Sequence, residues 1–183
     1  MGLAWTEQLS VGNAVLDSDH KNLISIVNNV RNAIRSRDSF ILSEAFIRLE
    51  DSLCIHFGNE ERISKAVNFD FSGHRQEQQY ALRELQHLRD ELVAKGGIWS
   101  DGATEHFTGF LKNWLIDDHI VRLDMLMKPA LQTRDYTFWP GWKDDEVNYT
   151  AGHTASLYLQ LLSPAARGQR AFWHPHLFQL ERN

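Results

Sequence analysis

Histidines and carboxylates at helical spacing are the residues in this sequence most able to do chemistry. His56 precedes Glu60 by four positions in "HFGNE", and His119 precedes Asp124 by five in "HIVRLD". Because each helical residue turns by about 100°, positions four apart share one stripe, so His56 and Glu60 can reach the same point. Asp124 lies about 140° round from His119, so we expect its carboxylate to approach that point from the side, as a bridging ligand would.

Two further histidines stand at the beginnings of expected helices. His20 opens one, and His74 opens another in "GHRQEQQY", where Gln78 stands one turn later in place of a second histidine. In an up-down bundle the start of one helix lies beside the end of the next, so His20, His74, His56 and His119 can lie at one level. Four imidazoles and the two carboxylates suit a pair of bridged iron ions, although the same ligand types also bind manganese and zinc.

Each of these features has an ordinary explanation when it stands alone. A single histidine at a helix end is usually exposed or capping, and a single His-x-x-x-Glu is usually a surface pair. The ordered combination at one level favours a metal site instead. Five histidines fall outside the pattern and are interpreted as ordinary: His87, His106, His153, His174 and His176.

The elements that must position these ligands are four amphipathic helices. We expect an irregular arm over 1–18, a helix cap at 17–19 and a second helix cap at 38–39. The third helix should begin at 72–73 and end at 96–97. The fourth should run from about 102 to 128, where Pro129 stops it. With short connections and no strand signal before residue 130, this pattern predicts an all-α, antiparallel up-down-up-down four-helix bundle over residues 1–128.

Residues 129–183 have a different character and are expected to form an irregular C-terminal extension. They hold all four prolines and three of the six tryptophans. Their basic and acidic residues cancel, so the bundle carries the whole net charge of −5. We expect the extension to pack on the bundle or to offer a docking element to a protein partner.

Composition excludes several classes of partner. The net charge of −5 provides no basic surface for nucleic acid or anionic lipid. No apolar stretch approaches the roughly 20 residues of a membrane span, and the N-terminus lacks the pattern of a secretory signal. Cys54 is the single cysteine, which is typical of a reducing compartment. These features predict a cytoplasmic protein.

Four stretches resemble the bacterial hemerythrin family. They are Trp5 with "LSVGNAVLDSDHKNL", "HFGNEE", "GHRQEQ" and "WLIDDHIVRLD", which together span about residues 5–128. The resemblance implies a non-heme di-iron centre in a four-helix bundle that binds O₂ reversibly. By motif, one iron would take His20 and His56, and the other would take His74, the residue at 78 and His119, while Glu60 and Asp124 would bridge them.

The sequence departs from that family pattern at two places. Gln78 stands where a fifth histidine is expected, so its amide oxygen is a weak ligand or water takes the position. Trp114 lies one residue farther from His119 than is usual, which in an α-helix would rotate one of them by about 100°. Leu115 or Ile116 is expected to line the O₂ pocket.

These departures favour a binding or sensing protein over an oxygen carrier. Loss of one imidazole leaves an iron less electron-rich and more open to water, so we expect rapid autoxidation and a role in oxygen or redox sensing. Two alternatives remain open: a di-iron enzyme that reduces peroxide or nitric oxide, and a mononuclear or metal-poor structural relative.

Overall fold

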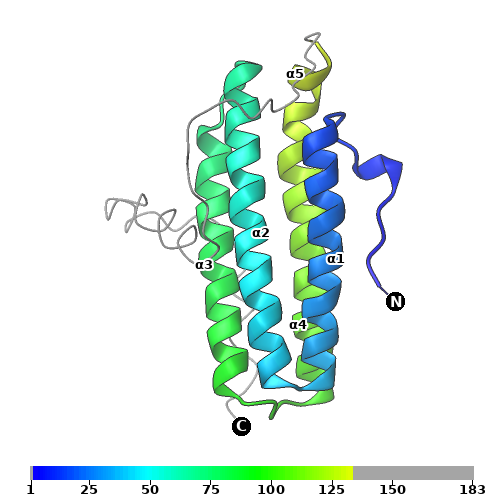
Figure 1. The fold of residues 1–183 in the computed structure, drawn as a ribbon, viewed down its shortest axis with the longest axis vertical. Helices are drawn as coiled ribbons and strands as arrows, with labels where there is room; N and C mark the ends of the chain where they lie inside the picture. The colour runs from blue at the N-terminus through cyan, green and yellow to red at the C-terminus, as the bar shows by residue number, and fades with distance from the viewer. Residues whose placement is uncertain (1, 134–183) are drawn as a thin grey trace.

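The computed structural model describes residues 2–133, and the expectations for 134–183 lie outside the described residues. Four long helices lie side by side: α1 (Ala14–Ser36), α2 (Ser39–Ala66), α3 (Ser72–Ala94) and α4 (Asp101–Asn113) (Figure 1). From α4 the chain continues through a π-helical segment, Trp114–Leu123, a 3₁₀ turn, Asp124–Met127, and the short α5, Lys128–Gln132. The predicted antiparallel four-helix bundle is confirmed.

The beginning of α1 differs from the prediction. The helix begins at Ala14, where the side chain of Asn13 accepts hydrogen bonds from the backbone N–H groups of Val15 and Leu16. Asp17, predicted as part of the cap, instead accepts hydrogen bonds from Ser10 Oγ at 2.6 Å and from Val11 N at 2.9 Å. The predicted arm over 1–18 is therefore too long, because Asp17 fastens the arm to the first turn of the helix rather than beginning that helix.

The predicted cap at 38–39 and the predicted start and end of the third helix agree with the structure. Asp38 caps α2 by accepting from Phe40 N and Ile41 N, and α3 begins at Ser72. Gly96 and Gly97 follow α3 with φ of 56° and 87°. A Cβ on Gly97 would lie 2.4 Å from the carbonyl oxygen of Arg37, so this turn requires glycine.

The sequence predicted that Pro129 stops the last helix, but in the structure it does not. It lies in the first turn of α5, where its missing N–H group would have no partner in any case. The helical path therefore runs on to Gln132.

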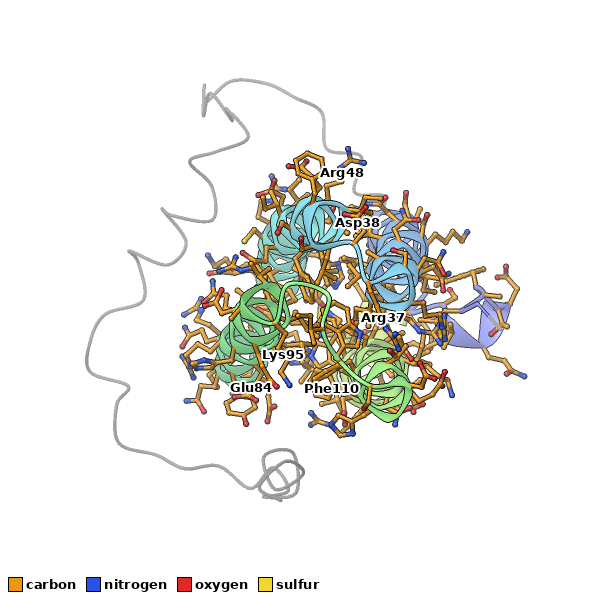
Figure 2. The ribbon with its side chains drawn as sticks, turned by 90° about the horizontal axis from the view of Figure 1, so that it is seen from below. Arg37, Asp38, Arg48, Glu84, Lys95 and Phe110 are labelled. Carbon is orange, nitrogen blue, oxygen red and sulfur yellow. The ribbon has the colours of Figure 1, made fainter. Side chains whose placement is uncertain are left out.

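The interior has two apolar clusters separated by buried polar residues. The large core fills the longer part of the bundle around Phe46, Leu49 and Leu85. The cap cluster closes the other end with seven buried residues: Val11, Leu16, Ile63, Val67, Phe71, Met127 and Leu131. Seen from below in Figure 2, the four helices surround an interior filled with side chains.

Candidate metal centre

Seven buried polar residues form a layer between the two apolar clusters, and we call them the polar layer. On α1, for example, Leu16 belongs to the cap cluster and Leu23 to the large core, while His20 lies between them. Each side chain of the layer is at most 3% exposed. The members are His20, His56, Glu60, His74, Gln78, His119 and Asp124. The structure thus brings together the six predicted ligands and Gln78.

One carboxylate oxygen lies at the meeting point of three imidazoles. Asp124 Oδ2 is 3.0 Å from His20 Nε2, 3.4 Å from His119 Nε2 and 3.7 Å from His56 Nε2. The Nε2 atoms of His56 and His119 are themselves 3.0 Å apart. Three helical elements therefore aim ring nitrogens at one anionic oxygen, which is an arrangement suited to a cation.

Glu60 brings a second carboxylate to the same place. Its Oε2 is 3.5 Å from His56 Nε2 and accepts a hydrogen bond from Gln78 Nε2 at 2.6 Å. The side chains of His56, Glu60, His119 and Asp124 each offer a ligand atom, and these atoms all lie within 4.8 Å of one another. Imidazole and carboxylate ligands at this spacing can hold a transition-metal ion.

The π-helical segment explains how residues five apart share one face. The backbone N–H of Asp124 donates to the carbonyl oxygen of His119, five residues earlier, which is the hydrogen bond of a π-helix. By the same winding the ring of Trp114 stacks on His119, with centroids 5.9 Å apart and planes inclined by 12°. The expected rotation of Trp114 away from His119 is therefore wrong, because it assumed α-helical geometry.

Asp19 supports the layer from outside, a role that the sequence analysis missed. Its Oδ2 lies 3.5 Å from His56 Nδ1 and accepts a hydrogen bond from Asn59 Nδ2 at 2.8 Å. A carboxylate behind an imidazole fixes the ring orientation and raises its basicity as a ligand. The only signal in the sequence was its position directly before His20.

The charges of the layer shift its pKa values in opposite directions. Burial disfavours the protonated form of His56, but the charge of Glu60 and hydrogen bonds to Asp124 and Asp19 outweigh burial and raise the His56 pKa to about 10. Burial lowers the pKa of His119 to about 3, with Asp124 opposing that shift. Burial and the charge of Asp124 raise the pKa of Glu60 well above its usual range. A proton therefore remains on His56 at neutral pH in the metal-free protein.

Six atoms of the layer lack a hydrogen-bond partner among the described residues. Two are ring nitrogens, His20 Nδ1 and His56 Nδ1, of rings whose Nε2 atoms already face Asp124. The other four are Glu60 Oε1, Asp124 Oδ1, His74 Nε2 and Gln78 Oε1. His74 already hydrogen-bonds the backbone of Leu123, and its ring stacks on Phe71 with centroids 5.1 Å apart. Buried polar atoms without partners are rare and costly. The two carboxylate oxygens, His74 Nε2 and Gln78 Oε1 fit a bound cation, which would give each of them a partner.

A small cavity reaches the layer between α3 and the helical path that begins with α4. It has a volume of about 60 Å³, and Trp114 and His119 are among its lining residues. Glu84 of α3 and Phe110 of α4 also line it, and Figure 2 labels both. Leu115 is buried in the large core and Ile116 packs against that core. Neither lines this cavity, so their place beside a bound ligand stays a prediction.

Comparison with known proteins decides the family. The sequence model of the hemerythrin HHE cation-binding domain matches residues 11–131. The chain belongs to the hemerythrin HHE cation-binding family. A hemerythrin-like protein of Naegleria gruberi is 31% identical over 129 residues, covering 69% of this chain and 92% of that protein. Bacteriohemerythrin of Pseudomonas aeruginosa is 23% identical over 116 residues, covering 63% of this chain and 72% of the relative.

Solved hemerythrin structures share the fold. A hemerythrin variant with a leucine-to-tyrosine substitution superposes with a TM-score of 0.60 at 23% identity, covering 70% of this chain and 96% of that one. Among residues 2–133, no helix has the length and apolar character needed to cross a membrane.

Proposed function

We propose that the polar layer holds two non-heme iron ions bridged by Glu60 and Asp124, and that this centre binds O₂. The observation that carries the proposal is that Glu60, Asp124, His74 and Gln78 each bury a polar atom without a partner, beside three imidazoles that converge on Asp124. Membership of a cation-binding family supports a metal. The names of the relatives, bacteriohemerythrin and hemerythrin-like protein, support iron and O₂.

Four histidines would bind the two ions, and Asp19 and Trp114 would hold the rings of two of them in place. His20 and His56 would hold one iron, while His74 and His119 would hold the other. Asp19 would keep His56 oriented, and Trp114 would keep the ring of His119 in place by stacking. The ions would supply the electrons and the open coordination position that O₂ binding needs. The apolar clusters on both sides would exclude bulk water, which protects a ferrous centre from losing electrons.

We assign this centre to oxygen or redox sensing in the cytoplasm rather than to oxygen transport. Gln78 replaces an imidazole, and a neutral amide donates less electron density to a metal than imidazole does. The iron beside Gln78 would also be more open to water, which favours oxidation of the ferrous form. Residues 129–183 would offer the element through which a protein partner reads the oxidation state.

The O₂ proposal is tested by mixing the anaerobic ferrous protein rapidly with air and following its absorbance. We expect bands in the near-ultraviolet and visible to form and then to convert within minutes to the spectrum of the ferric protein. A first spectrum that persists for hours in air would contradict a sensing role and indicate a carrier. No spectral change beyond that of free iron would contradict O₂ binding at this site.

A further inference from the structure

The side of the bundle between α3 and α4 is hollowed. These two helices pack against each other less closely than α1 packs against α2 or α4, and less closely than α2 packs against α3. The cavity of about 60 Å³ beside His119 is one hollow there, and a second hollow of about 40 Å³ adjoins it. Glu84 and Phe110, both labelled in Figure 2, line the two hollows. We call the two hollows together the α3–α4 groove.

The α3–α4 groove combines apolar surface with an excess of negative charge. Its apolar lining residues are Ala81, Leu88, Phe107, Phe110, Trp114 and Leu123. The carboxylates that line it are Glu77, Glu84, Glu91 and Asp118. They outnumber the basic side chains, which are Arg122 in the lining and Lys95, 3.3 Å from Glu91. Glu77 and Glu91 are fourteen residues apart on α3, which makes the groove about 21 Å long. Such a surface suits a segment that is both apolar and basic.

One stretch of this chain beyond the described residues has that composition. Residues 147–180 contain no aspartate or glutamate, but they contain Arg167 and Arg170. The acidic residues of the extension lie on either side of this stretch, at 135, 144–146 and 181. Aliphatic and aromatic residues are frequent within it, in "SLYLQLL" and in "AFWHPHLFQL". We call residues 147–180 the acid-free stretch, and its charge complements that of the groove.

The chain is long enough to bring the acid-free stretch to the groove. The described residues end at Thr133, only ten residues after Leu123, which lines the hollow beside His119. The thirteen residues 134–146 can span up to about 45 Å, whereas α2, the longest helix with 28 residues, is about 42 Å long. Every part of the groove is therefore within reach. The tether also gives the stretch a high effective concentration, on the order of millimolar.

We infer that the acid-free stretch docks in the α3–α4 groove of its own chain and covers the hollow beside His119. A second copy of the chain fits the groove less well, because its bundle carries the same net charge of −5 and would meet like charge. Phe40, Ile47 and Ile55 form another exposed apolar surface on α2, but they line neither hollow. The inference goes beyond the proposed metal function, since the groove and the stretch attract each other with or without a bound ion.

The test is photo-crosslinking within the full chain. The photoreactive amino acid p-benzoylphenylalanine replaces His87, an exposed residue that lines the groove. The matched control carries the same amino acid in place of Ile47, on the exposed surface of α2. Dilute protein is irradiated, products of single and double mass are separated by denaturing gel electrophoresis, and the joined peptides are identified by mass spectrometry.

Charge variants test why the stretch would choose this groove. With the crosslinker at position 87, the double substitution Arg167→Glu and Arg170→Glu should lower the yield about fivefold, because attraction becomes repulsion. Glu84→Lys should lower it too, and the three substitutions combined should recover much of the yield. Arg182→Glu, outside the acid-free stretch, and Glu44→Lys, exposed on α2, are the matched controls and should change nothing.

We expect crosslinks from position 87 to peptides of residues 147–180, in products of single mass, and few such crosslinks from position 47. Crosslinks from position 87 that never reach this stretch would overturn the inference. Equal or greater yield from position 47 would place the stretch on α2 instead. Products of double mass from position 87 would assign the groove to a second copy. A yield that no charge variant alters would show that charge does not select the groove.

Discussion

The large core and the cap cluster lie on opposite sides of the polar layer, and they are built in different ways. The large core comes mainly from the regular faces of four helices. The cap cluster draws on the arm before α1 through Val11, on the turn between α2 and α3 through Val67 and Phe71, and on α5 through Leu131. The large core should therefore determine stability, while the cap cluster should determine how well the metal is shielded from water.

Contacts between irregular segments hold the cap cluster closed. Lys128 Nζ donates a 2.6 Å hydrogen bond to the carbonyl oxygen of Ser10, which joins α5 to the N-terminal arm. Asp17 joins the same arm to α1. A few polar contacts hold these segments together, whereas extensive packing between helices stabilises the large core. The cap cluster should therefore open more readily than the large core.

Removing the charge at the centre of the polar layer should have the largest effect. In Asp124→Asn, three imidazoles lose the anionic oxygen that they face, so we expect iron affinity to fall at least about 100-fold. Metal content after gel filtration measures this loss. Asp117→Asn, an exposed residue of the π-helical segment, is the control and should bind iron as wild type does. Equal iron content in the two variants would show that Asp124 is not a ligand.

Matched leucine truncations test the two clusters against each other. Leu49→Ala leaves a cavity in the large core, so it should lower the free energy of unfolding by about 2–5 kcal/mol while metal release stays unchanged. Leu131→Ala in the cap should cost less stability, because α5 has only five residues, but should speed metal release to a chelator. Urea unfolding and chelator kinetics measure the two effects. Faster release from Leu49→Ala than from Leu131→Ala would contradict the assigned roles.

Metal binding should strengthen as pH rises. His56, with its pKa raised to about 10, is protonated at neutral pH in the metal-free protein, and a metal must displace that proton. Affinity should rise about tenfold per pH unit for each displaced proton and level off near pH 10. Competition with a chelator of known pH dependence provides the measurement. An affinity independent of pH between 6 and 9 would mean that metal binding displaces no proton from His56.

The same raised pKa has the opposite effect on the metal-free fold. Protonated His56 stabilises that fold fully below its ordinary pKa of 6.5, and this contribution is lost as pH rises through about 10. The thermal midpoint of metal-free protein should therefore fall across this window, whereas that of the metal-loaded protein should not.

The smallest expected effect concerns the start of α1. Asn13→Ala removes the side chain that caps this helix, and we expect a loss of about 1 kcal/mol in unfolding free energy by urea denaturation. Asp17→Ala should loosen the arm and speed metal release without that loss of helix capping. Equal stability of wild type and Asn13→Ala would show that the cap contributes little.

The sequence predicts the regular parts of this molecule better than the irregular ones. Apolar spacing, the Asp38 cap and the glycines at 96–97 give the bundle because each acts locally. Spacing also indicated His56 and Glu60, which lie one turn apart on one helix face. His20 and His74 were indicated by their places at the starts of helices. The start of α1 was misplaced because both Asn13 and Asp17 have cap chemistry, and only the tertiary contact with the arm separates them.

Three features could not be predicted from the sequence. They depend on irregular helical winding or on a contact between helices, and the spacing of residues along one regular α-helix shows neither. The π-helical winding puts Trp114 on His119 despite the extra residue between them. Pro129 is tolerated because a new helical turn begins there. The orientation of the Gln78 amide depends on Glu60, eighteen residues away. Only the π-helical winding left a signal in the sequence, which is the extra residue between Trp114 and His119.

The most direct test of a bridged iron pair is iron quantification combined with Mössbauer spectroscopy of wild-type protein. The protein is reconstituted anaerobically with ⁵⁷Fe²⁺ in excess and then oxidised in air. We predict two irons per chain and a magnetically coupled ferric pair. One iron per chain with the signal of an isolated ferric ion, even at saturating iron, would contradict a carboxylate-bridged pair in the polar layer.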